Sequence, residues 1–91
     1  MALDPGFGYR VKATVTDIKE KCNAGHKVGD SFEISCHNPA GLCGVFYHQL
    51  FPTLQTFQFG GNMPWWQDDT IQLQCPDSRN LVTIKLERSK R

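Results

Sequence analysis

Four short segments of the chain alternate apolar and polar residues, and this period of two constrains the fold more than any other feature. In residues 9–18, tyrosine, valine, alanine and valine alternate with arginine, lysine and threonine. Residues 31–36, 70–75 and 81–88 repeat the pattern. Because successive side chains of a strand point to opposite faces of a sheet, each segment is expected to be a strand with one buried face.

The segment between the second and third strands changes to a helical period. Apolar residues recur from Leu42 to Leu50 at the spacing of one helix face. Asn38, which is followed by proline, suits the start of a helix, and Pro52 is expected to stop or kink it. Residues 53–59 fit either a second short helix or a strand.

The order strand, strand, helix, strand, strand predicts an α+β domain: a small antiparallel sheet with a helical segment packed on one face. The turn-forming residues between the last two strands predict a hairpin. A chain of 91 residues has the length of one domain. We expect residues 1–8 to be a flexible N-terminal segment, residues 9–91 to form the domain, and residues 87–91 to be a solvated charged tail.

Composition and charge exclude several classes of function. The formal net charge is +1, which gives no electrostatic reason to expect a nucleic-acid or membrane partner. The start of the chain lacks the basic and apolar regions of a signal peptide, and the longest apolar region is too short to cross a bilayer. We therefore expect a cytoplasmic protein, in which the four cysteines remain reduced or bind a metal.

The positions of three cysteines and one histidine suggest a metal site. Cys22 and His26 lie four residues apart in the loop after the first strand, a spacing typical of zinc ligands. Gly25 permits the tight turn that such a pair needs. Cys43, at the start of the helix, and Cys75, at the end of the third strand, would complete a tetrahedral, zinc-like site.

Two alternatives remain open for the same residues. Reduced cysteines are often small core side chains with no function beyond packing. A reactive thiol is the other alternative: Cys43 lies near a helix N-terminus, whose amide dipoles favour the thiolate, and Cys22 with His26 could form a thiolate–imidazolium pair. A thiol-dependent enzyme or redox protein would use these two cysteines.

The remaining cysteine and histidines are weaker candidates. Cys36 is expected to point inward from the second strand, and His37, which follows it, toward solvent. His48 lies five residues after Cys43, so on a helix its side chain points in a different direction from that of Cys43. We expect both histidines at the surface or its boundary.

The loop of residues 59–69 carries two adjacent tryptophans, Trp65 and Trp66. In an extended segment their side chains point in different directions. One can seal the edge of a small core while the other is exposed, or both can pack against the sheet. An exposed tryptophan would suit a protein partner that docks through this loop. Asp68 and Asp69 beside them argue against a platform for nucleic-acid bases.

Several sequence blocks together resemble an uncharacterised family of bacterial and archaeal proteins of similar length. The blocks are KC...GHKVGDSFEI, GLC, F.FGG..PWW and CPD....VTIKLER, and they span Tyr9 to Arg88. The family pattern has Cys22, Cys43, Cys75, Gly60, Gly61, Pro64 and Trp65 at the matching positions. Asn23 departs from the family pattern, in which proline often follows the first cysteine. The resemblance implies a shared site of three cysteines, with His26 as its fourth member, and implies no particular reaction.

Overall fold

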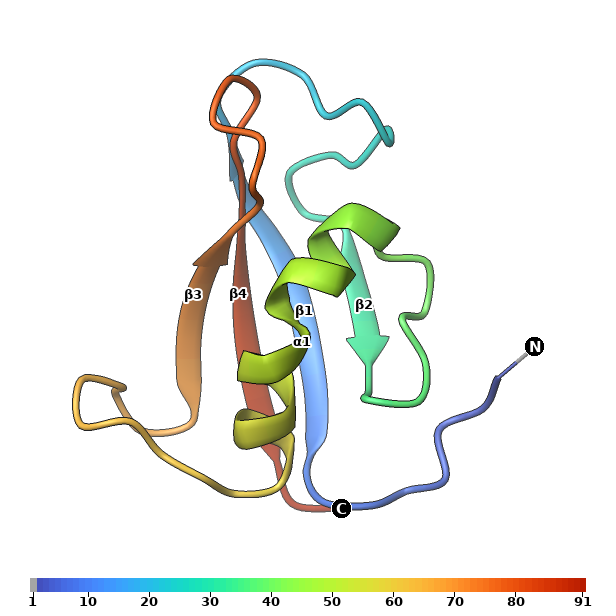
Figure 1. The fold of residues 1–91 in the computed structure, drawn as a ribbon, viewed down its shortest axis with the longest axis vertical. Coiled ribbons are helices and arrows are strands. Elements are labelled where there is room, and N and C mark those ends of the chain that lie inside the picture. The colour runs from blue at the N-terminus through green and yellow to red at the C-terminus, as the bar shows by residue number, and fades with distance from the viewer. Residues whose placement is uncertain (1) are drawn as a thin grey trace.

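The computed structural model describes residues 2–91, which form a four-stranded sheet covered by one helix (Figure 1). The strands are β1 (Arg10–Ile18), β2 (Ser31–Ile34), β3 (Thr70–Gln74) and β4 (Val82–Ser89), and the helix α1 (Gly44–Gln58) joins the two halves. Neighbouring strands all pair antiparallel, in the order β2-β1-β4-β3. The predicted α+β fold is confirmed, including the hairpin of the last two strands.

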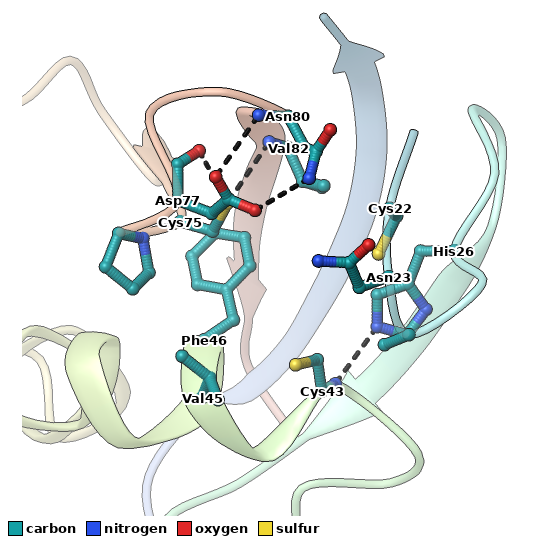
Figure 2. Close-up of a pocket in the computed structure, with 12 residues that line it drawn as sticks. Cys22, Asn23, His26, Cys43, Val45, Phe46, Cys75, Asp77, Asn80 and Val82 are labelled. Atoms are coloured by element: carbon teal, nitrogen blue, oxygen red, sulfur yellow. Dashed lines mark hydrogen bonds between the residues drawn. The ribbon is translucent and has the colours of Figure 1, made fainter. Parts of the chain in front are cut away.

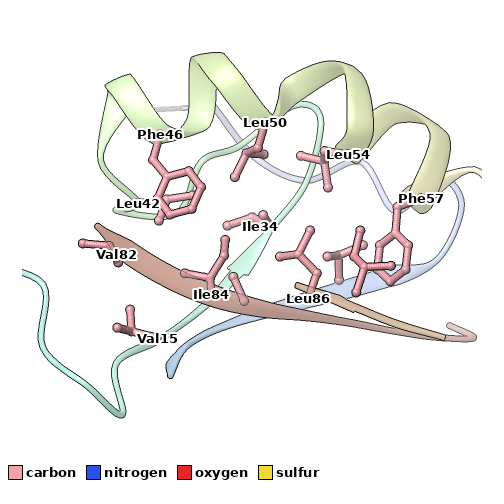
Figure 3. Packing of buried hydrophobic residues seen from close by; sticks show 13 residues of the cluster. Val15, Ile34, Leu42, Phe46, Leu50, Leu54, Phe57, Val82, Ile84 and Leu86 are labelled. Carbon is pink, nitrogen blue, oxygen red and sulfur yellow. The ribbon is translucent and has the colours of Figure 1, made fainter. Parts of the chain in front are cut away.

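The core lies between α1 and the face of the sheet that the alternating pattern made apolar (Figure 3). The helix contributes apolar side chains spaced three or four residues apart, which is the spacing of one helix face. Every second residue of β1 and β4 meets them from below. The buried hydrophobic residues are Val11, Ala13, Val15, Ile34, Leu42, Phe46, Leu50, Leu54, Phe57, Ile71, Val82, Ile84 and Leu86.

The helix begins later than its capping residues suggested. The side chain of Asn38 accepts the backbone N–H of Ala40 at 2.9 Å, so it closes a local turn and caps no helix. Ala40 and Gly41 then adopt positive φ angles of 53° and 90°, which a right-handed helix does not allow. α1 therefore starts at Gly44, with Cys43 as its N-cap residue.

The helix also continues through Pro52 to Gln58, so the expected stop at this proline is wrong. Pro52 is exposed, whereas Leu54 and Phe57 beyond it are fully buried. Burying these two side chains outweighs the ~3 kcal/mol that an interior proline costs a helix. The ambiguous segment 53–59 is thus mostly helix. No helix within residues 2–91 is long and apolar enough to cross a membrane.

Replacing Pro52 with alanine is expected to raise the free energy of unfolding by about 1–3 kcal/mol. The substitution restores the backbone N–H that the carbonyl oxygen of His48 lacks, and it adds no buried atoms. Urea denaturation of the two proteins measures the difference. Gln55→Ala, at another exposed position of the same helix, is the control and is expected to change stability by less than about 0.5 kcal/mol. A loss of stability in Pro52→Ala would show that core packing requires the proline.

Arg88 is buried, contrary to the expectation of a solvated tail. Its side chain is 4% exposed, and its guanidinium donates to the backbone oxygens of Phe57 and Gly61 at 2.8 Å each. It also pairs with Asp69 at 3.0 Å. Because Phe57 lies in the last turn of α1 and Gly61 just beyond it, the cation binds carbonyls at the C-terminal end of the helix and complements the helix dipole. Arg88 thereby fixes the end of the helix to β4.

Both termini contact the end of α1 or each other. The side chain of Gln58, fully buried, donates to the backbone oxygen of Phe7 at 3.0 Å and accepts the N–H of Cys36 at 2.8 Å. Asp4 pairs with Arg91 at 2.6 Å. These contacts hold the segment before β1 near the end of the domain at which Figure 1 shows the C-terminus.

Candidate metal centre

One cavity of about 200 Å³ lies between the loop that follows β1, the start of α1 and the turn that joins β3 to β4. All four residues predicted as metal ligands line it, and Figure 2 shows them around it. They come from three segments far apart in the sequence, which the sheet order brings together because β1 and β4 are neighbours. The lining residues are Cys22, Asn23, Ala24, His26, Cys43, Val45, Phe46, Cys75, Pro76, Asp77, Asn80 and Val82.

Cys43 connects the helix to the first loop. Its backbone N–H donates to Nε2 of His26 at 3.0 Å, as the dashed line in Figure 2 shows. Its own thiol caps no N–H of the helix, so the sulfur remains available. As the N-cap residue, Cys43 lies at the N-terminal end of α1 and therefore at the positive end of the helix dipole.

His26 is held in one orientation by two contacts. Nε2 accepts the N–H of Cys43, which requires a neutral imidazole with its proton on Nδ1. The ring also packs edge-on against Phe32, with 4.9 Å between the ring centroids. His26 therefore fastens the first loop to the start of the helix. Coordination of a metal through Nε2 would require the hydrogen bond from the Cys43 N–H to be broken.

Cys75 closes β3, and its sulfur accepts a backbone hydrogen bond. The N–H of Val82 lies 3.2 Å from its Sγ, and the backbone N–H of Cys75 donates to the oxygen of Val82 at 2.9 Å. These two hydrogen bonds to Val82, at the base of the hairpin turn, position Cys75.

The hairpin turn is ordered by Asp77 and tied to the first loop by Asn80. The amide and backbone N–H of Asn80 both donate to the Asp77 carboxylate, and they lower the pKa of that group. The backbone oxygen of Asn80 accepts the N–H of Lys19 at 3.0 Å, and its side-chain oxygen accepts that of Lys21 at 3.3 Å. The strand that leads to Cys22 is therefore fixed against the turn that follows Cys75.

Cys22 opens a turn at the edge of the cavity. The N–H of Gly25 donates to its backbone oxygen at 3.0 Å, and Gly25 has a φ of +86°. This conformation strains any residue with a Cβ, so the tight turn predicted at this glycine is present. A side chain at position 25 would meet nothing within 4 Å, so the constraint is conformational and not steric.

The four side chains share the cavity without forming a closed ligand set. Zinc–sulfur bonds of about 2.3 Å place coordinating sulfurs roughly 4 Å apart. Within residues 2–91, no three His, Cys, Asp or Glu side chains lie close enough to hold a metal ion as they stand. All four cysteines are free and half-buried. The thiols of Cys22, Cys43 and Cys75 therefore line one cavity, but their sulfur atoms do not lie close enough together to bind one ion.

Cys36, His37 and His48 lie outside this cavity. Both histidines are exposed, as expected. Cys36 packs against the core beside Tyr47, and burial, followed by the charge of Asp4, raises the pKa of its thiol above the ordinary 9.0. Burial likewise raises the pKa of Tyr47, whose hydroxyl donates to the backbone oxygen of Ser35 at 2.6 Å.

Alkylation of the reduced, metal-free protein near neutral pH is expected to modify Cys36 more slowly than the other three cysteines. Only the thiolate reacts, and a raised pKa lowers its population. The rate at Cys36 should rise once the pH exceeds 9, the ordinary value for a thiol. Iodoacetamide labelling followed by peptide mass spectrometry measures each site. Fast labelling of Cys36 at neutral pH would contradict its assignment as a packing residue.

The two tryptophans have different environments. Trp66 is half-buried and packs edge-on against Phe57, with 5.8 Å between the ring centroids. Trp65 is 75% exposed. One tryptophan therefore seals the core at the end of α1, and the other presents its ring to solvent at the start of β3.

Comparison with known proteins finds no matching family model, no matching curated protein and no matching solved structure.

Proposed function

We propose that the chain is a small metal-binding module in which the thiolates of Cys22, Cys43 and Cys75 bind one zinc-like ion. The observation that carries the proposal is the shared cavity: three thiols from three separate segments line it. Thiolates together with imidazole are the donors that zinc prefers in proteins. The apolar walls formed by Val45, Phe46 and Val82 limit the access of water to such an ion.

Two of the three proposed ligands lie at defined positions of regular elements. The N-terminus of α1 ends at Cys43, and the N–H of Val82 points at the sulfur of Cys75. Cys22 lies on a turn that depends on Gly25. Since this turn belongs to a loop and the other two cysteines adjoin regular elements, the loop is the part that must move inward to bring three sulfurs to one ion.

His26 has a positioning role in this proposal and remains the candidate for the fourth ligand. Its Nε2 is engaged by the N–H of Cys43, so it first holds the loop at the helix. Ligation would exchange that hydrogen bond for a bond to the ion, and otherwise water would occupy the fourth position.

The role of the ion would be structural. A domain of 91 residues buries a modest core, and a metal that links three distant segments supplies folding free energy directly. The reducing cytoplasm suits this role, because its thiols remain free to bind a metal.

The test is the zinc content of the refolded chain. Protein refolded with excess zinc and then freed of unbound ion by gel filtration is expected to hold about one zinc per chain by elemental analysis. The matched variants are Cys43→Ser, expected to lose the ion, and Cys36→Ser, expected to keep it. Equal zinc content in both variants, or none in the native chain, would reject the proposal.

A thiol-dependent redox protein is the second candidate, and the common cavity of Cys22 and Cys43 supports it. In that case the two thiols would be oxidised to a disulfide by a disulfide reagent, which would itself be reduced to two thiols. Mass spectrometry after treatment with oxidised glutathione tests this. A Cys22–Cys43 disulfide in a chain that binds no zinc would favour the redox function over the metal site.

A further inference from the structure

The strand β3 forms one edge of the sheet, and its outer backbone groups have no neighbouring strand. In Figure 1 it lies at the left of the sheet, with no element beyond it along its upper half. Two backbone hydrogen bonds to β4 determine which residues of β3 face outward. The N–H of Cys75 donates to Val82, and the N–H of Arg88 donates to Asp69, both across the β3–β4 ladder. The odd-numbered residues of β3 therefore bond to β4, and Gln72 and Gln74 direct their N–H and C=O groups outward.

This edge lacks the features that usually prevent strands from pairing between molecules. The sequence of β3 is TIQLQ, with no charge and no proline, whereas protected edges carry lysine, proline or bulges. The opposite edge, β2, has only 4 residues, and its Glu33 pairs with Arg10 at 2.8 Å. Only the first residue of β3 is covered, because the N–H of Thr70 already donates to Gln67.

We propose that two copies of the chain pair antiparallel along β3, about a two-fold axis at Leu73. In this register Gln72 lies opposite Gln74 of the partner subunit, and the reverse pair is identical by symmetry. Both residues of each pair present their N–H and C=O outward, so the pairs exchange backbone hydrogen bonds in both directions. The result is one continuous eight-stranded sheet with both helices on the same face.

The surroundings of β3 support a second copy as the occupant. A groove of about 580 Å³ runs along this edge, lined by Trp65, Met63 and residues of β3. The two-fold arrangement places the start of the partner's hairpin turn beside Trp65, where Pro76 of the partner subunit ends the pairing opposite Thr70. The residues of β3 that pair carry no charge, so no like charges lie opposite each other within the ladder, and each edge supplies the donors that the other accepts.

The interface is small, since the ladder provides few hydrogen bonds and the groove adds the remaining contacts. Interfaces below the standard size are weak, so we expect a dissociation constant of roughly 10–100 µM. Sedimentation equilibrium of the native chain over a range of concentrations around this value measures it. A chain that stays monomeric up to about ten times the upper value would reject the proposal.

Charge substitutions at the exposed side chains of Gln72 and Gln74 identify the interface and its register. Gln72→Glu combined with Gln74→Glu places like charges opposite each other and is expected to weaken dimerisation at least tenfold. Gln72→Lys combined with Gln74→Glu places opposite charges in each pair and is expected to restore it. The dissociation constants of the two double variants are expected to differ only if residue 72 of one subunit faces residue 74 of the other.

A proline substitution provides an independent test that removes one hydrogen bond. Gln72→Pro deletes an outward N–H and leaves the ladder to β4 intact, as edge strands tolerate. It is expected to abolish the dimer, whereas Glu33→Pro at the opposite edge is expected to leave it unchanged. Circular dichroism confirms that each variant is folded. A folded Gln72→Pro variant that still dimerises, or loss of the dimer in Glu33→Pro, would overturn the proposal.

Discussion

Replacement of Arg88 by alanine is expected to lower the free energy of unfolding by about 3 kcal/mol. The substitution removes the donor to the backbone oxygens of Phe57 and Gly61. The oxygen of Phe57 then retains only the longer bond from the N–H of Gly60 at 3.3 Å, and loss of partners at such acceptors costs free energy. The substitution also removes the guanidinium that lies 4.6 Å from the centre of the Phe57 ring. For a domain of 91 residues, whose total stability is of order 5–14 kcal/mol, this is a large fraction.

Two further variants separate the contributions of Arg88. Arg88→Met keeps most of the buried volume but donates no hydrogen bonds, and Arg88→Lys keeps the charge without the planar fork that reaches several oxygens. Arg10→Ala is the control, because Arg10 and Glu33 form an ion pair whose side chains are each 56% exposed, and such pairs contribute less than about 1 kcal/mol. Guanidinium chloride denaturation measures all four. Equal stability of Arg88→Met and the native chain would show that packing alone explains the burial.

Zinc is expected to stabilise the native chain by about 4 kcal/mol when free zinc exceeds the dissociation constant about a thousandfold. Only the folded chain brings the three thiols to one cavity, so binding shifts the equilibrium toward it. Cys43→Ser and Cys75→Ser each remove one of the proposed ligands and are expected to abolish most of this gain. Thermal denaturation with and without zinc, under reducing conditions, measures the effect in each variant.

The control for the zinc experiment is Cys36→Ser, which removes a thiol outside the cavity and should retain the full gain. His26→Ala distinguishes the two roles of His26. Loss of zinc binding would identify it as the fourth ligand, whereas retained binding with lower stability in the absence of zinc would identify it as the residue that fastens the loop. Stabilisation by zinc that is equal in Cys43→Ser and the native chain would contradict the proposed ligands.

The strands and their buried faces were predictable because a period of two is local information. The start of the helix was not, since the conformations of Ala40 and Gly41 decide it and the capping residue type of Asn38 suggested an earlier start. Burial of Arg88 depends on the position of the α1 terminus, which is a long-range feature. The sequence did contain one indication of this burial. Arg88 follows Val82, Ile84 and Leu86 at the same spacing of two residues, which places its side chain on the inward face of the strand.

The sequence predicted which cysteines would approach one cavity, but it did not predict their contacts. Inward faces and the adjacent loop indicated that Cys22, Cys43 and Cys75 would approach one another, and the three line one cavity. The hydrogen bond between the Cys43 N–H and His26 involves a backbone group, which a pattern of side chains does not reveal. The distances among the sulfurs depend on the loop conformation, which sequence spacing leaves undetermined.

X-ray absorption spectroscopy at the zinc edge, on the chain loaded with one equivalent of zinc, tests the three-thiolate centre most directly. The proposal predicts three sulfur neighbours at about 2.3 Å and a reduced number in Cys43→Ser, with no change in Cys36→Ser. A first shell made only of nitrogen and oxygen neighbours, or a sulfur count that Cys43→Ser leaves unchanged, would contradict it.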